Sequence, residues 1–137
     1  MREEKIFRLG RLSIEGDLIA FEPEPERSFH AARRDAVSVG VQYAYRESSP
    51  DQEVATIRLT AHVEGQRPRT EEAVIRDNPL ADDSRRGFLS VPIQVPGAGA
   101  MRGRFVVEAR YGAGPWRKAA ELEVEERADG EFSLVIH

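Results

Sequence analysis

Apolar and polar residues alternate along most of this chain. The alternating runs lie at residues 37–45, 54–64, 88–95, 104–111 and 117–125. In a β-strand successive side chains point to opposite faces, so each run predicts a strand with one buried and one solvated face. Helical periodicity is nearly missing. The pattern predicts an all-β protein of about eight or nine antiparallel strands. Its core should contain Ile57, Leu59, Val107 and Leu122.

An N-terminal hairpin is predicted around the turn sequence Glu15-Gly16-Asp17-Leu18. Gly16 can adopt the positive φ of a two-residue hairpin turn. Pairing about this turn sets Leu12 opposite Phe21. The apolar phase slips near Gly10, which predicts a β-bulge there.

The chain length of 137 residues indicates a single domain. We interpret residues 1–26 as an N-terminal hairpin with a proline-rich connector and residues 37–137 as the main sandwich. Pro23 and Pro25 should end the hairpin in an extended segment. A short helical turn is expected within residues 27–36.

A second hairpin is predicted where Gly112-Ala113-Gly114-Pro115 separates two alternating runs. We expect Tyr111 to pair with Trp116, which would turn both rings toward the core. The same register opposes Phe105 to Leu122, Val107 to Ala120 and Arg104 to Glu123.

Two further segments are predicted at sheet borders. Pro92 cannot donate a ladder hydrogen bond, so its strand should be an edge strand or contain a bulge. Asp129-Gly130 is a turn signal that should direct residues 132–136 back beside residues 120–126. We expect the three large apolar side chains of this last run, Phe132, Leu134 and Ile136, to be buried.

The run Arg104-Phe-Val-Val-Glu-Ala-Arg-Tyr-Gly-Ala-Gly-Pro-Trp116 resembles the last hairpin of fibronectin-III and other immunoglobulin-like domains. In those domains an alternating aromatic and Val/Ala strand enters a Gly/Pro loop. The resemblance covers residues 104–124 only, and the paired core cysteines of antibody domains are absent. It implies an immunoglobulin-like antiparallel β-sandwich, here with an N-terminal hairpin extension, acting as a binding or spacer module. It assigns no functional residue.

Composition narrows the function classes. The chain has 20 basic and 24 acidic residues, a balance that does not indicate a nucleic-acid partner. The absence of cysteine excludes disulfides, thiolate metal sites and a cysteine nucleophile. No stretch is long and apolar enough for membrane insertion, and no secretory signal is evident, so we expect a cytoplasmic protein.

A calcium site is one interpretation of the acidic segment 77–84. Asp77, Asp82 and Asp83 offer hard oxygen ligands, although they lack the regular spacing of known calcium loops. The adjacent Arg85 and Arg86 oppose cation binding, and Asp is also common in turns. We expect no cofactor and no catalytic residue, since no nucleophile or zinc motif is present.

Paired arginines are the other candidate site. Arg85, Arg86, Arg102 and Arg104 could bind phosphate, sulfate or an acidic protein if they converged on one rim, or they could simply form a solvated surface. Trp116, the single tryptophan, would either cap the core or anchor an interface.

The leading hypothesis is a non-catalytic β-sandwich that serves as an interaction or assembly module of a bacterial cytoplasmic or virion-like complex. It would bind a protein partner or self-associate, for example through strand edges at residues 88–95 or 132–136. The alternative is a barrel or sandwich that binds a small or anionic ligand through loop arginines. A calcium-dependent binding module is the third.

Overall fold

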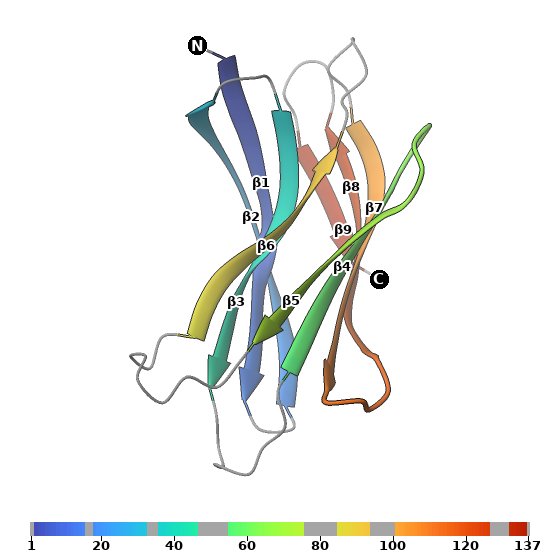
Figure 1. Ribbon diagram of the computed structural model, residues 1–137. Helices are drawn as coiled ribbons and strands as arrows, with labels where there is room; N and C mark the ends of the chain where they lie inside the picture. The colour runs from blue at the N-terminus through green and yellow to red at the C-terminus, as the bar shows by residue number, and fades with distance from the viewer. Residues whose placement is uncertain are drawn as a thin grey trace.

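The chain forms two β-sheets that face each other (Figure 1). The computed structural model describes residues 2–15, 18–32, 36–46, 55–75, 85–93, 101–126 and 132–136. Within these ranges it has nine strands and no helix. They are β1 (Arg2–Glu15), β2 (Leu18–Ala32), β3 (Ala36–Arg46), β4 (Ala55–Val63), β5 (Arg69–Ile75), β6 (Arg85–Ile93), β7 (Met101–Tyr111), β8 (Arg117–Glu126) and β9 (Phe132–Ile136). The predicted all-β sandwich is confirmed.

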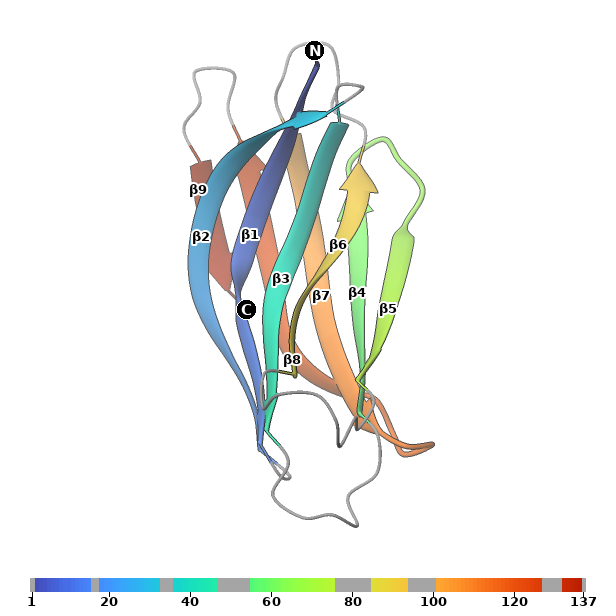
Figure 2. The ribbon, with the colours of Figure 1, turned by 60° about the vertical axis from the view of Figure 1, so that its left-hand side comes forward.

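One sheet has the strand order β2-β1-β3-β6 and the other has the order β5-β4-β7-β8-β9. Figure 2 shows β2 and β9 on one lateral side of the molecule and β5 and β6 on the other. All neighbouring strands are antiparallel except β1 and β3, which are parallel. The exception arises because β2 returns along one border of β1 and β3 then adds to the other border.

The N-terminal hairpin has the predicted register, with Leu12 opposite Phe21 and an irregularity next to Gly10. The predicted connector and helical turn are wrong within the described residues, because β2 continues through both prolines to Ala32. Its pairing moves from Gly10–Pro23 to Arg8–Glu26, so residues 24 and 25 of β2 oppose only residue 9 of β1. A bulge on an edge strand tolerates the missing proline N–H groups.

The core lies between the two sheets and is built from the apolar phase of each alternating run. The four predicted core residues, Ile57, Leu59, Val107 and Leu122, are fully buried, which confirms the predicted faces. The largest other fully buried side chains are Phe7, Leu9, Leu12, Ile14, Val39, Val41, Val91 and Phe105. Both sheets therefore contribute to one continuous hydrophobic cluster.

The hairpin between β7 and β8 follows the predicted register only in the part away from its turn. Phe105 opposes Leu122 and Val107 opposes Ala120, but the register then shifts and Ala109 opposes Arg117. The predicted pairing of Tyr111 with Trp116 is wrong because the bulge adds a residue to β8. The turn itself is closed by the Gly114 N–H, which donates to the Tyr111 carbonyl at 2.9 Å.

The predicted border strands are in place. β6, which contains Pro92, is an edge strand, and β9 pairs antiparallel with β8 so that Leu134 opposes Val124. Leu134 packs against the core, but Ile136 is 45% exposed, so the predicted burial of that side chain is wrong. The side chain of Phe132 lies outside the described part of the structure.

Candidate functional site

The outer face of the five-stranded sheet carries the polar phase of β4, β7 and β8. Arg58 on β4 lies directly opposite Glu108 on β7. Its Nε and Nη2 atoms both donate to Oε1 of Glu108, at 3.1 and 3.0 Å. The two side chains are 26% and 21% exposed, so this ion pair is better shielded from water than an ordinary surface pair.

Trp116 lies on this outer face, not in the core. The guanidinium carbon of Arg58 is 3.9 Å from the centre of the indole ring, and that of Arg110 is 4.5 Å from it. Cations at this distance from an aromatic ring are attracted by its π electrons. The predicted core cap is therefore wrong, since the bulge in β8 moves Trp116 to the opposite face. Nε of Arg110 is buried there and has no hydrogen-bond partner.

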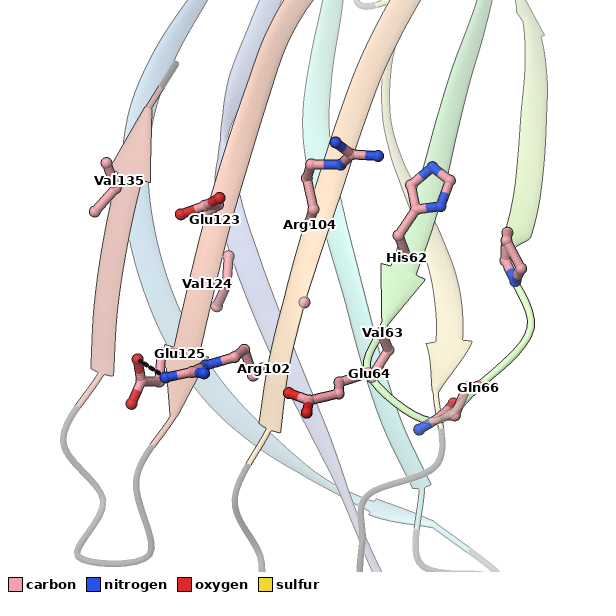
Figure 3. A pocket seen from close by; sticks show the side chains of 12 residues that line it. His62, Val63, Glu64, Gln66, Arg102, Arg104, Glu123, Val124, Glu125 and Val135 are labelled. Carbon is pink, nitrogen blue, oxygen red and sulfur yellow. Dashed lines mark hydrogen bonds and ion pairs between the residues drawn. The ribbon is translucent and has the colours of Figure 1, made fainter.

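A cavity of about 570 Å³ lies farther along the same face, between β4, β7, β8, β9 and the turn after β4 (Figure 3). Its lining residues are His62, Val63, Glu64, Gln66, Pro68, Arg102, Gly103, Arg104, Glu123, Val124, Glu125 and Val135. The turn between β4 and β5 borders this cavity. Gly65 in this turn has a φ of 80°, and the Gln66 N–H donates to the Val63 carbonyl at 3.0 Å. A glycine is favoured at this position because L-residues rarely adopt a positive φ.

Arg102 and Arg104, two of the predicted binding residues, line this cavity. Nη2 of Arg102 is 3.2 Å from Oε2 of Glu125, and Nη1 of Arg104 is 3.6 Å from Oε1 of Glu121. Each guanidinium thus has a carboxylate of β8 close by, which offsets the positive charge that an anion would require. The cavity presents a mixed polar surface, and no group of metal-ligating side chains occurs among the described residues.

The predicted hairpin register correctly places Glu123 opposite Arg104, but sequence reasoning did not include the glutamates of β8 in the candidate site. Glu121, Glu123 and Glu125 alternate with core residues of β8, so they share the outer face with Arg102 and Arg104 of the neighbouring strand. The spacing of two residues between these glutamates was the feature of the sequence that places them on one face of the strand. It predicts a row of acids beside a row of bases once the hairpin register is known.

The other predicted site residues lie elsewhere. Arg85 and Arg86 open β6, opposite Tyr45 and Ala44 of β3. In Figure 1 β6 begins at one end of the sandwich and β7, which carries Arg102 and Arg104, begins at the other. The structure therefore does not bring the four arginines together. The calcium candidates Asp77, Asp82 and Asp83 lie outside the described residues.

The sheet borders are the remaining candidate. Four strands end the two sheets: β2, β5, β6 and β9. β2 contains glutamates and two prolines, β5 contains Arg69, Glu71 and Glu72, and β6 contains arginines and Pro92. Charges and prolines at sheet edges discourage pairing with another chain. β9, with the sequence Phe-Ser-Leu-Val-Ile, has neither.

Exposed apolar surface accompanies this unprotected edge. Val135 is 48% exposed and faces outward opposite Glu123, while Ile136 is 45% exposed and opposes Leu122. Figure 3 shows Val135 on the outermost strand of the sheet, at the rim of the cavity. The two side chains alternate along the strand, so β9 has exposed apolar atoms on both of its faces.

No family model, curated protein or solved structure matches this chain. No helix that could span a membrane occurs among the described residues.

Proposed function

We propose that this chain is a non-catalytic, immunoglobulin-like β-sandwich that serves as an interaction and assembly module. It binds a protein strand at the border strand β9. The observation that carries this proposal is the contrast between β9, which lacks charge and proline, and the three other described sheet edges, which contain one or both. An unprotected edge offers its backbone N–H and C=O groups to an incoming strand.

The exposed side chains supply the apolar part of this binding. An added strand would cover atoms of Val135 on one face and of Ile136 on the other, both of which are about half exposed. Backbone hydrogen bonds give such a complex its affinity, and side chains at alternate positions give it specificity.

The strand order supports the immunoglobulin-like part of the proposal. In that fold strand B pairs with E in one sheet, and C, F and G are neighbours in the other. Here β3 pairs with β6, and β4, β7 and β8 are neighbours. β5 adds to the border of β4, as strand C′ does in variable-type domains. The hairpin β1–β2 occupies the place of the first strand, with the difference that β1 is parallel to β3 whereas the sheets of that fold are antiparallel. β9 extends the second sheet beyond G.

The alternative, an anion-binding protein, has less support. The arginines that line the cavity are close to Glu121 and Glu125 within the chain, and Arg58 is bound to Glu108. An anion would have to compete with carboxylates that are already in place. For this reason we favour a protein partner at β9 over a small anionic ligand.

Peptide selection tests the proposal. A phage library of short random peptides is selected on the wild-type protein, and the enriched peptides are then measured against two variants. Val135→Lys places an ammonium on the β9 edge, while Val74→Lys makes the same change at a 54% exposed valine on the β5 edge of the same sheet. We expect extended apolar peptides that bind the wild type and Val74→Lys but lose binding to Val135→Lys.

Two results would contradict this function. One is a selection that enriches no peptide for a chain that also shows no association through β9. The other is a set of peptides that bind Val135→Lys as tightly as they bind the wild type, which would place their site away from β9.

A further inference from the structure

The β9 edge is complementary to a second copy of itself. We propose that the partner strand is β9 of another molecule of this chain, paired antiparallel about Leu134, so that two five-stranded sheets join into one. This inference rests on the function proposed above and names its partner.

The register follows from the length and alternation of the strand. With Leu134 opposite its own copy, Phe132 lies opposite Ile136 and Ser133 lies opposite Val135. Residues at even spacing share a face, so Leu134 and Ile136 stay on the core side in both copies and Val135 stays on the outer side. Each opposed pair consists of apolar or small residues, and no charge is buried by the contact.

The other described edges do not pair with themselves in this way. β5 centred on its middle residue would place Glu72 opposite Glu72, and like charges directly opposite are destabilising. β2 carries Pro23 and Pro25, and β6 carries Pro92, each of which lacks a backbone donor. β9 is the described edge whose self-pairing meets neither obstacle.

A two-fold contact also closes on itself. It uses the β9 edge of each molecule once, so the assembly stops at a dimer. Pairing β9 with a different edge of the next molecule would instead leave an unused β9 and continue as a filament. The charged and proline-containing edges β2, β5 and β6 disfavour that open arrangement.

Electrostatic repulsion does not prevent the contact, although the chain has a net charge of −4. The acidic row of Glu121, Glu123 and Glu125 lies on β8, one strand in from the edge. In the dimer the two β8 strands would be separated by three strand spacings, about 14 Å. This exceeds the Debye length of about 8 Å at physiological ionic strength, so the two rows are largely screened from each other.

The contact between the two β9 strands is small, so the dimer should be weak. A pair of five-residue strands buries less surface than the roughly 1,200–2,000 Å² of a stable specific interface. We therefore expect a dimer that forms with increasing protein concentration and dissociates on dilution.

Analytical ultracentrifugation of the full chain over a concentration series tests this inference. The wild type should shift from monomer to dimer, and Val135→Lys should raise the dissociation constant by about tenfold or more, because the two introduced ammonium groups lie diagonally across the new strand pair. Within one molecule the same change lies opposite Glu123, an attractive pair that favours the native fold. Val74→Lys is the matched control and should dimerise like the wild type.

A cysteine variant tests the register. The chain has no cysteine, so Leu134→Cys introduces one thiol per molecule. Directly opposed residues of antiparallel strands have Cα atoms about 4.5–5.5 Å apart, within the range that a disulfide spans. Mild oxidation should cross-link Leu134→Cys into a dimer, whereas Val74→Cys should stay monomeric.

The results separate this inference from the proposed function. A wild type that stays monomeric at every concentration overturns the inference, as does cross-linking of Leu134→Cys no greater than that of Val74→Cys. If selected peptides nevertheless bind at β9, the module recruits the strand of a different protein and the proposed function stands. If neither peptides nor a second copy bind there, both proposals are wrong.

Discussion

At the scale of single residues, the alternating pattern predicts burial well where both neighbouring strands are regular. Leu59 illustrates this, since it sits on β4 between β5 and β7 and is fully buried. Trp116 shows the limit. Its face depends on one extra residue in β8, and a small apolar residue such as Ala119 fits a bulge without changing the sequence pattern.

Truncating Leu59 should create a cavity in the core. We expect Leu59→Ala to lower the free energy of unfolding by about 2–5 kcal/mol, the range for a fully buried leucine. Urea denaturation followed by circular dichroism measures the loss. The control is Leu18→Ala at a 67% exposed leucine, which should cost less than about 0.5 kcal/mol. Equal losses at both positions would show that the assigned face of β4 is incorrect.

The two arginines at Trp116 should differ in what they contribute. Arg58→Met would leave the carboxylate of Glu108, 21% exposed, without its guanidinium partner, so we expect a loss of about 1–3 kcal/mol. Arg110→Met would remove a buried Nε that has no hydrogen-bond partner and should be nearly neutral. Thermal and urea unfolding of both variants checks this. A greater loss for Arg110→Met would mean that its guanidinium makes the more important contacts.

At the scale of elements, the sequence predicts the strands with strict alternation and misses those without it. β3, β4, β6, β7 and β8 overlap the five predicted runs, the start of the β1–β2 hairpin is predicted from its turn, and β9 pairs where its turn signal directs it. The alternating pattern does not predict β5, because this edge strand is largely exposed to solvent and has Glu71 and Glu72 where a buried strand would alternate apolar and polar residues. The continuation of β2 through its prolines was also missed, since only its position at a sheet border makes it tolerable.

The turn between β4 and β5 offers a test of backbone geometry alone. Gly65 has a φ of 80°, and a Cβ built there meets no atom within 4 Å. Any cost of Gly65→Ala therefore comes from the left-handed conformation, and we expect about 1–2 kcal/mol. Gly65→Asn should cost less, because asparagine tolerates this region better. Equal stability of all three proteins in urea would mean that the turn can rearrange freely.

At the scale of the whole molecule, alternation identifies two faces for each strand but leaves the order of strands open. The parallel contact between β1 and β3 could not be predicted, because a strand buried on one face has the same pattern beside either neighbour. For the candidate site, the sequence singles out Arg102 and Arg104. The predicted hairpin register also sets Arg102 opposite Glu125, whereas the contact of Arg104 with Glu121 is diagonal and depends on side-chain conformation, which the alternating pattern does not give.

The position of β9 at the end of a five-stranded sheet gives the last prediction. Removing residues 131–137 would make β8 the border strand and expose apolar surface of Leu122 and Val124, which β9 now helps to cover. Leu134 would also be lost from the core cluster, and burying a leucine contributes roughly 1.5–3 kcal/mol when complete. We therefore expect the truncated protein to melt at a lower temperature than the wild type. Both should be compared at a dilution where each is monomeric by light scattering, so that the difference reports the fold itself. An unchanged melting temperature under these conditions would mean that β9 contributes nothing to the stability of the sandwich. The absence of charge in β9 would then matter only for its contact with another chain.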